Sequence, residues 1–241
     1  MEVDIGGAAR VRMPAAYANK PWEKYETETM KVFAEWCEKN PQARILDVGS
    51  SVGLFTLAGL FAHPDNQLTA FDSDLSSLNV LQDFCRLASG RRLTVVRGLI
   101  TKAGCGWSVE EAAEITRKAL AELPQATPNT STNYILMQNE DSQGVPQLSL
   151  DEMMRNWVID PRPVFLKIDV EGAEQLVIEG GEKWIQKIRP TILLEVHEKF
   201  LPIFGHSLDS LSNVLKKYGY QVHLFATDYQ QHWLCKPPSQ V

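Results

Sequence analysis

Residues 45–74 read ILDVGSSVGLFTLAGLFAHPDNQLTAFDSD, and their pattern is the clearest indication of the fold. An apolar run that stops at Asp47 leads into a glycine turn, and a second apolar run stops at Asp72. Short apolar runs bounded by turn residues are typical of buried parallel strands, and 54–61 between them is typical of a crossover helix. Strand, helix and strand of roughly 30 residues form a βαβ unit. In an open α/β sheet such a unit places the turn and both carboxylates where ligands bind.

The spacing of the glycines favours S-adenosylmethionine over a dinucleotide as the ligand of this unit. Three other residues separate Gly49 from Gly53, so the middle glycine that lets a pyrophosphate approach the backbone is absent. Asp47 would repel a pyrophosphate but could bind the ammonium group of S-adenosylmethionine. Asp72 could accept hydrogen bonds from ribose hydroxyls. The predicted cofactor-binding residues of this unit are Asp47, Gly49, Ser50, Gly53, Asp72 and Ser73.

The composition is that of a soluble intracellular protein. The chain has 241 residues, of which 44% are hydrophobic, enough to bury one sizeable core. A net charge of -6 gives no basic footprint for a polyanion, so we expect no nucleic-acid partner. No early apolar run indicates a signal peptide or a membrane span, and we expect a cytoplasmic location. The cysteines lack metal-ligand spacing, and we expect reduced thiols at Cys37, Cys85, Cys105 and Cys235.

Helical and strand patterns alternate along most of the chain. Residues 1–20 show no clear periodicity, and a helix is expected to begin at Pro21. The alternation predicts an α/β fold with a doubly wound, mostly parallel sheet. The other expected elements are a crossover helix at 75–88, strands at 93–100, 164–169 and 191–196, and a final hairpin of 220–226 and 232–236.

Residues 101–147 interrupt this alternation as an insertion. The capping box of Ser108 and Glu111 predicts a helix up to Leu123, and a short apolar run follows at 134–137 between polar loops. Long loops in compact domains are often functional, so the insertion could cover a substrate. The alternative is a surface decoration without a role in binding.

A second cluster of ionisable residues lies in the sequence VFLKIDVEGAE. Alternate residues of a strand share a face, so Lys167 and Asp169 point the same way, and Glu171 follows where the strand ends. The next strand repeats the arrangement with Glu195 and His197 at its end. Such groups on apolar strands are costly unless they are paired or functional. A doubly wound sheet would bring both sets near the bound cofactor.

The motifs ILDVGSSVG, AFDSD, LSLDEMM, FLKIDVEGAEQLVIEGGEKW and RPTILLEVHE, in this order, resemble the FkbM-type S-adenosylmethionine-dependent methyltransferases. The resemblance covers about residues 25–225. It implies a seven-stranded Rossmann-like methyltransferase fold in which the last hairpin adds an antiparallel strand. It also implies an O-methyltransferase acting on a hydroxyl of a sugar, glycan or natural product. The expected organisation is an N-terminal segment and helix over 1–40 and a methyltransferase domain over 41–241, with the insertion at about 101–147.

Two positions depart from the family's pattern. The usual Phe-Glu-Pro after the second strand is Phe71, Asp72 and Ser73 here, which keeps the carboxylate but shortens its reach and loosens the turn. The usual Asn-Ala after the third strand is Gly98 and Leu99. The resemblance places these two residues near the adenine of the cofactor, without the usual side-chain contact.

Methyl transfer to a hydroxyl requires that the acceptor oxygen be aligned with the methyl group and lose a proton. His197 has the best claim to act as base or to orient the acceptor, because histidine titrates near neutral pH. Asp169 or Glu171 could serve as base if burial raised its pKa. We expect Asp169 to lie nearest the cofactor, with Lys167 and Glu171 as a supporting network. The structural alternative is that Lys167 and Glu195 pair and merely tie two strands together.

Three further alternatives remain at this stage. Asp169, Glu171 and Glu195 offer oxygen ligands for a divalent metal such as magnesium, but Lys167 beside them already compensates negative charge, so we favour a metal-free site. A NAD-dependent oxidoreductase would share the βαβ unit but would need the missing glycine. A non-catalytic module would bind the cofactor or a protein partner without turnover.

Overall fold

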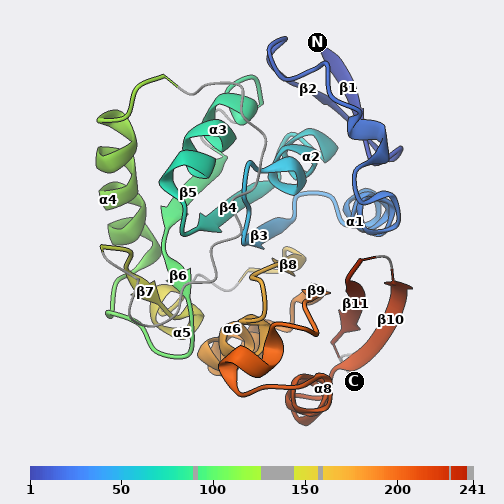
Figure 1. Cartoon of the computed structure of the whole chain (residues 1–241), viewed down its shortest axis with the longest axis vertical. Coiled ribbons are helices and arrows are strands. Elements are labelled where there is room, and N and C mark those ends of the chain that lie inside the picture. The colour runs from blue at the N-terminus through green and yellow to red at the C-terminus, as the bar shows by residue number, and fades with distance from the viewer. Residues whose placement is uncertain (89–91, 126–143, 157–159, 228, 238–241) are drawn as a thin grey trace. The chain divides into compact units, whose positions relative to one another are not determined.

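The computed structural model describes residues 1–88, 92–125, 144–156, 160–227 and 229–237 (Figure 1). They belong to two compact units: unit 1 comprises Met1–Arg97 and Ala113–Asn133, and unit 2 comprises Gly98–Ala112 and Tyr134–Val241. The main sheet has seven strands, and helices flank it. Their order across the sheet is β10 (Gln221–Thr227), β11 (Gln231–Lys236), β9 (Thr191–Val196), β8 (Val164–Ile168), β3 (Arg44–Val48), β4 (Gln67–Asp72) and β5 (Leu93–Arg97). The strands β3, β4 and β5 run parallel to one another, as do β8 and β9, whereas β11 pairs antiparallel with both β9 and β10. The predicted α/β fold with a C-terminal antiparallel hairpin is therefore confirmed.

Unit 1 contains the βαβ unit predicted from the first glycine motif. It consists of β3 (Arg44–Val48), α2 (Leu54–Ala62) and β4 (Gln67–Asp72). The two strands are parallel, and their register pairs Asp47 with Ala70. Almost every residue of α2 is buried, because the helix packs on both strands and is itself covered by α1 (Thr27–Lys39) and β2 (Ala9–Arg12). This explains why its sequence is apolar all round rather than amphipathic.

The start of unit 1 differs from the expectation. Residues 1–20, which show no clear periodicity, include an antiparallel hairpin of β1 (Glu2–Ile5) and β2. Its turn uses Gly6 and Gly7, both at positive φ. Each strand has four residues and only one buried side chain, Ile5 or Val11, so the alternation is too short to stand out.

The helix expected from Pro21 begins later than predicted. A short 3-10 turn, η1 (Trp22–Lys24), comes first, and α1 starts at Thr27. Glu26 between them has a left-handed φ of 37°, which interrupts the helical backbone. Unit 1 also contains α3 (Leu75–Cys85) and β5 (Leu93–Arg97), as well as the part of α4 (Val109–Ala121) from Ala113 onward.

The expected strand at 93–100 is two strands. Main-sheet pairing ends with β5, and β6 (Leu99–Ile100) in unit 2 pairs instead with β7 (Gln147–Leu148). Gly98 stands between them, and a Cβ there would lie 3.2 Å from the carbonyl oxygen of Pro146. Because residues rich in branched side chains lie on both sides of Gly98, the sequence resembles one continuous strand and does not indicate the break.

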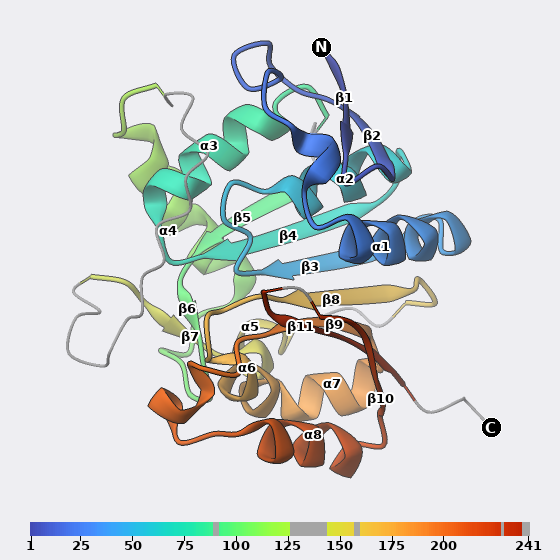
Figure 2. The same ribbon diagram turned by 45° about the vertical axis from the view of Figure 1, so that its right-hand side comes forward.

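Unit 2 carries the remaining strands of the main sheet, with α6, α7 and α8 on one side of β8 and β9 (Figure 2). The predicted final hairpin is confirmed, with a register shift between Leu224 and Ala226 on β10. The elements are α5 (Leu150–Met153), β8 (Val164–Ile168), α6 (Glu174–Gly180), α7 (Glu182–Ile188), β9 (Thr191–Val196), η2 (Leu201–Phe204), α8 (Leu208–Lys217), β10 (Gln221–Thr227) and β11 (Gln231–Lys236).

The inserted region begins as predicted. Ser108 and Glu111 form the capping box, with the Ser108 amide 2.7 Å from Glu111 Oε2, and α4 (Val109–Ala121) follows. The apolar run at 134–137 lies outside the described residues. Whether the insertion covers a substrate stays a prediction.

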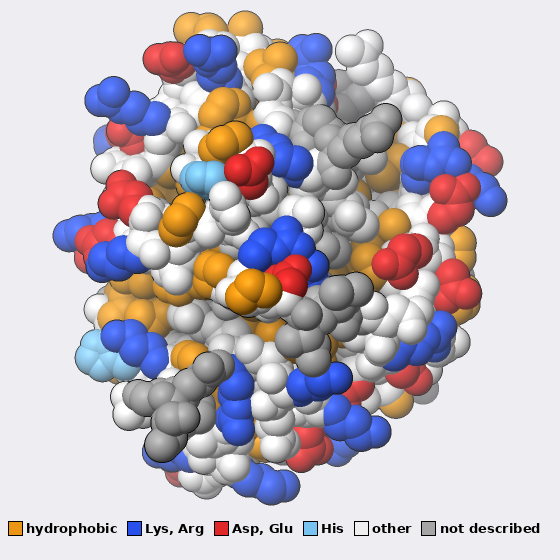
Figure 3. All heavy atoms as spheres, turned by 180° about the vertical axis from the view of Figure 1, so that it is seen from behind, with side chains coloured by type: hydrophobic (Ala, Val, Ile, Leu, Met, Phe, Trp, Pro, Cys, Tyr) orange, Lys and Arg blue, Asp and Glu red, His pale blue; other side chains and the backbone are white. Residues whose placement is uncertain are grey.

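Three of the cysteines, Cys37, Cys85 and Cys235, are buried, whereas Cys105 is exposed. Burial raises the pKa of the Cys37 and Cys235 thiols to about 12, which makes both poor nucleophiles. On the face seen in Figure 3, Lys and Arg side chains are interspersed with Asp and Glu side chains. None of the helices in the described ranges has the length and apolar character needed to cross a membrane.

Candidate active site

The turn after β3 has a tight backbone that small residues make possible. Gly49, Ser51 and Gly53 have φ values of 79°, 49° and 85°. The amides of Gly49 and Ser50 both donate to the carbonyl of Phe71, each at 2.9 Å. A Cβ on Gly53 would lie 2.5 Å from Leu81 Cγ, so glycine is required there for packing as well as for φ.

Asp72 holds this turn in place. Its Oδ2 accepts a hydrogen bond from the Ser51 amide at 2.7 Å, and its Oδ1 accepts one from the Asp74 amide at 2.9 Å. The carboxylate is partly exposed. Asp72 therefore shapes the glycine turn in addition to the ribose contact predicted for it, and its short side chain suits the first of these tasks.

Polar atoms at the turn fit a polar ligand. The hydroxyls of Ser50 and Ser51 are buried and have no hydrogen-bond partner among the residues that the structure describes. Asp47 is 1% exposed, and its Oδ2 accepts a hydrogen bond from Thr56 Oγ1 at 2.7 Å. Buried polar groups are normally satisfied, so orphaned hydroxyls beside a buried carboxylate indicate a place for a bound polar group. This agrees with an amino acid moiety at Asp47.

The other predicted cofactor residues lie in two places. The backbone carbonyl of Ser73, in unit 1, accepts a hydrogen bond from Arg97 Nε at 3.2 Å. Gly98 and Leu99 belong to unit 2, where the Leu99 amide donates to the Pro146 carbonyl at 2.9 Å. The role of these residues toward the cofactor stays a prediction.

The second half of the candidate site, in unit 2, follows from the register of β8 and β9. Ile168 pairs with Leu194, so the next residue along each strand brings Asp169 opposite Glu195. Side chains two residues apart share a face, which places His197 beside them. The structure thus brings the ionisable residues of the two strand ends together, as the sequence predicts.

His197 is the centre of this cluster. Its Nδ1 lies 2.8 Å from Glu174 Oε1, and its Nε2 lies 3.2 Å from Glu171 Oε2. Asp169 Oδ1 and Glu195 Oε1 are each 3.8 Å from Nε2. The imidazole is 2% exposed and stacks on Phe200 with an angle of 11° between the rings.

The two carboxylates that follow β8 are the accessible members of the cluster. The side chains of Asp169 and Glu171 are 22% and 20% exposed, whereas that of Lys167 is 4% exposed. Lys167 Nζ lies 3.0 Å from Asp169 Oδ2. Asp169 and Glu171 are therefore more accessible from solvent than Lys167 and His197.

Glu171 has a strained backbone. Its φ of 52° lies in the left-handed region, and Gly172 follows with φ 102°. A left-handed conformation costs a non-glycine residue on the order of 1–2 kcal/mol. A Cβ on Gly172 would lie 2.6 Å from Phe200 Cβ, so the turn also packs tightly. Such strain is often kept where a side chain must be aimed, and here it directs Glu171 toward His197.

The charges of the cluster shift two pKa values. Burial lowers the pKa of His197, but the hydrogen bond to Glu174 and the charges of Asp169, Glu174 and Glu171 outweigh it, so the pKa lies above 6.5. Burial raises the pKa of Glu171 above 4.5; His197 opposes this effect, and Asp169 and Glu174 add to it. The Glu171–His197 pair therefore binds protons more tightly than the separate side chains would.

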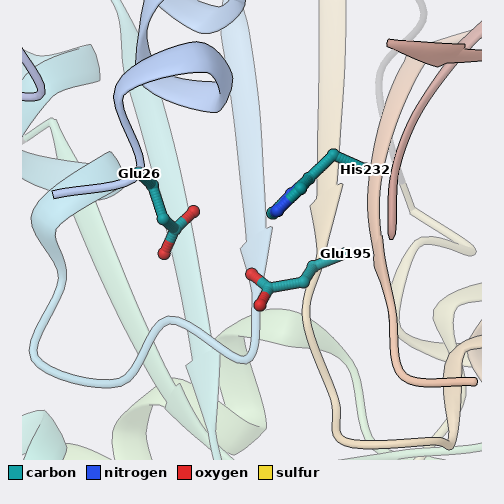
Figure 4. A group of neighbouring side chains, drawn as sticks. All are labelled: Glu26, Glu195 and His232. Atoms are coloured by element: carbon teal, nitrogen blue, oxygen red, sulfur yellow. The ribbon is translucent and has the colours of Figure 1, made fainter. Parts of the chain in front are cut away.

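Sequence reasoning missed Glu174 and His232. Glu174 opens α6, where an acidic residue usually means an ordinary contact with the helix dipole, yet here its carboxylate is fully buried against His197. His232 on β11 pairs with Glu195 on β9, and Figure 4 shows their side chains on the same side of the two strands. Glu26, also labelled there, belongs to unit 1. The spacing Glu-Gly-Ala-Glu after the strand was the one signal for Glu174.

Within the described residues of unit 2, the ligand atoms of Asp169, Glu195 and His197 all lie within 4.8 Å of one another, so these side chains could hold a metal ion. This set has His197 where the sequence suggested Glu171. Lys167 contributes a positive charge 3.0 Å from one of the three, which opposes a second cation there. The metal-free interpretation stays the preferred prediction.

The comparisons with known proteins identify the family. The model of the methyltransferase FkbM domain matches residues 75–222, which is more than half of the chain. The chain therefore belongs to this family of methyltransferases, whose methyl donor, S-adenosylmethionine, is the cofactor predicted from the glycine turn. A comparison with curated protein sequences finds no match.

Two solved structures have the same fold. The methyltransferase FkbM from Methylobacillus flagellatus KT superposes with a TM-score of 0.53 and 14% sequence identity over 86% of this chain. This chain spans about half of that protein, 51% of its length. Precorrin-6y C5,15-methyltransferase from Geobacter metallireducens GS-15 has a TM-score of 0.50 and 12% identity, covering 95% of this chain and 94% of its own.

Proposed function

We propose that the protein is an O-methyltransferase that transfers a methyl group from S-adenosylmethionine to a hydroxyl of a sugar, a glycan or a hydroxylated natural product. The observation that carries the proposal is the cluster around His197, in which two partly exposed carboxylates are backed by a buried histidine. A hydroxyl, unlike an amine near neutral pH, needs its proton removed as it is methylated. A cluster that takes up a proton suits this acceptor.

The glycine turn would hold the cofactor. Asp47 would face the ammonium group, the amides and hydroxyls of the turn from Gly49 to Gly53 would surround the polar part, and Asp72 would accept from the ribose. When bound, S-adenosylmethionine supplies a positively charged sulfur from which the methyl group is readily displaced. The protein's own task is therefore to position the acceptor oxygen and to receive its proton.

We assign the proton to the Glu171–His197 pair. Glu171 is the accessible member, and its raised pKa makes it a better proton acceptor than an ordinary carboxylate. His197, 3.2 Å behind it, shares the added charge and keeps the carboxylate oriented. Asp169, held by Lys167, is placed to accept a hydrogen bond from the acceptor hydroxyl and so to align it. In the net reaction an O–CH3 bond forms, an S–CH3 bond breaks and one proton leaves the acceptor.

The test is a screen of hydroxylated acceptors with methyl-labelled S-adenosylmethionine, beginning with deoxysugars and glycans. The expected result is a labelled methyl ether whose formation is lost in Glu171→Gln and in Asp169→Asn. Labelling of an amine or thiol acceptor in preference to hydroxyls would overturn the assignment of oxygen. Cofactor binding without transfer to any acceptor, unchanged by either substitution, would favour a non-catalytic module.

Metal dependence is tested in the same assay. Full activity in the presence of EDTA is expected, because Lys167 already compensates charge in the cluster. Activity that is lost on chelation and restored by magnesium would instead assign Asp169, Glu195 and His197 as ligands.

A further inference from the structure

We propose that Glu174 is the positioning residue of the active site: one oxygen of its buried carboxylate fixes both the His197 imidazole and the turn that carries Glu171. The catalytic consequence rests on the proposed O-methyl transfer, whereas the positioning itself does not.

The contacts of Glu174 are unusual for a residue that opens a helix. Its side chain is completely buried, with 0% exposure. Oε1 accepts a hydrogen bond from the Gly172 amide at 3.0 Å and lies 2.8 Å from His197 Nδ1. A buried carboxylate is costly unless it is paired and hydrogen-bonded, and both of these contacts end on the same oxygen atom.

The contact with Nδ1 decides which nitrogen of His197 faces the acceptor side. A carboxylate cannot donate, so Nδ1 must carry the proton in this hydrogen bond. The other nitrogen, Nε2, is then the one that gains and loses a proton, and it faces Glu171, Asp169 and Glu195. Glu174 thereby selects the tautomer in which His197 can exchange a proton with Glu171.

The hydrogen bond between Glu174 and the Gly172 amide fixes Glu171, the other member of the Glu171–His197 pair. The Gly172 amide directly follows Glu171, whose left-handed backbone aims its carboxylate at Nε2. Because one oxygen holds the turn and the imidazole, Glu174 sets the separation of Glu171 and His197. Loss of its charge should therefore alter both the proton affinity and the alignment of the pair.

Among the described residues, the charged groups that form ion pairs with His197 come from the start of α6, the turn after β8 and the end of β9. Glu174 is on α6, Asp169 and Glu171 follow β8, and Glu195 is on β9; Lys167 neutralises part of this charge through Asp169. A matched control is Glu179→Gln, the same substitution on the same helix. Within the described residues, Glu179 accepts a hydrogen bond from Gln175 and forms an ion pair with Lys102, and neither contact involves His197.

The experiment is a 15N-histidine NMR titration of the wild type, Glu174→Gln and Glu179→Gln, with the His197 signal assigned by its loss in His197→Gln. In the wild type we expect Nδ1 to stay protonated throughout and Nε2 to titrate. In Glu174→Gln the pKa of His197 should fall by about 1 or more, as expected when an opposite charge within hydrogen-bond distance is removed. Glu179→Gln should titrate like the wild type.

The kinetic readout is the pH profile of kcat for methyl transfer. Glu174→Gln should lower kcat by roughly tenfold or more, which is part of the roughly 10²–10⁴-fold that acid–base catalysis contributes, and should move the acidic limb of the profile to lower pH. The KM for S-adenosylmethionine should stay unchanged, and so should both parameters in Glu179→Gln.

An unchanged His197 pKa in folded Glu174→Gln would overturn the proposal, as would an equal change in Glu179→Gln. If Glu174→Gln does not fold, the wild-type spectrum decides, because an unprotonated Nδ1 contradicts the proposed contact. The titration needs no acceptor. A chain that shows the expected titration but methylates no hydroxyl would refute the proposed function and leave the positioning role standing.

Discussion

At the residue scale, Ser51 and Glu171 lie in turns that are held in the same way. Both are non-glycine residues in the left-handed region, with φ values of 49° and 52°. In each turn a nearby carboxylate accepts a backbone amide: Asp72 accepts from Ser51, and Glu174 accepts from Gly172, the residue after Glu171. Two strained turns, one in each unit, are thus held by acidic side chains that the sequence alone would assign to a ligand or to a helix start.

The donor and acceptor roles can be separated with two substitutions. Asp47→Ala should weaken the binding of S-adenosylhomocysteine at least tenfold, because a buried carboxylate facing an ammonium group contributes roughly 1.5–3 kcal/mol. Asp169→Ala should bind it with near wild-type affinity and lose turnover. Isothermal titration calorimetry and the methyl-transfer assay measure these effects.

Thr56→Val is the structural control for Asp47, because it removes the 2.7 Å hydrogen bond but keeps the carboxylate. It should retain most of the affinity. Equal and small effects of Asp47→Ala and Asp169→Ala on binding and turnover would contradict the division of roles.

At the element scale, the strands that carry the site were predictable because their patterns are long or close to motifs. The sequence predicted that Asp169, Glu171 and His197 gather at the ends of β8 and β9, because alternation along a strand fixes which side chains share a face, and the structure brings them together. Their roles stay predictions. Glu174 was not predictable in this way, because its role depends on a contact between a helix and a strand end that no periodicity encodes. The hairpin of β1 and β2 was not predicted for a related reason, because each of its strands is too short to show a periodic pattern.

The turn between β8 and α6 should tolerate no Cβ at Gly172. Gly172→Ala would place a methyl group 2.6 Å from Phe200 Cβ and 2.9 Å from its carbonyl oxygen, at a φ of 102°. We expect a loss of about 2 kcal/mol or more in the free energy of unfolding, from backbone strain together with overpacking. Urea denaturation followed by circular dichroism measures it.

Gly205→Ala is the matched control, because Gly205 also has a positive φ, 74°, but nothing within 4 Å of an added Cβ. Gly205→Ala should lower the free energy of unfolding only through backbone strain, by on the order of 1–2 kcal/mol. If the two variants lost the same free energy of unfolding, the close contact with Phe200 would not contribute to the loss in Gly172→Ala.

At the scale of the whole molecule, the two halves of the predicted site fall in different compact units. The family model matches 75–222, which contains the cluster around His197 but not the glycine turn at 49–53. The turn was nevertheless recognisable from its own chemistry. The predicted domain boundary near residue 40 stays a proposal. The particular acceptor was not predictable from the sequence, because no local pattern in the chain identifies it.

The stability of the whole chain should depend on pH through the His197 cluster. A histidine whose folded pKa is raised contributes stability below its unfolded pKa of about 6.5 and loses it as pH rises through the folded value. The raised pKa of Glu171 changes stability in the same direction. Its contribution to the free energy of unfolding is present below about pH 4.5 and declines as the pH rises through the folded pKa. Urea unfolding at pH 6 and pH 8.5 should show a larger loss of stability in the wild type than in His197→Gln. An identical pH dependence of the two would contradict the raised pKa of His197.

The last hairpin has a consequence for how copies of this protein meet in solution. β10 ends the order of the main sheet, and an outer strand offers unpaired amides and carbonyls to which a strand of another molecule could bind. The register shift between Leu224 and Ala226 interrupts the regular spacing of that ladder, next to a leucine that is 50% exposed. Irregular outer strands resist edge-to-edge association, so we expect this register shift to disfavour pairing between the β10 strands of two copies.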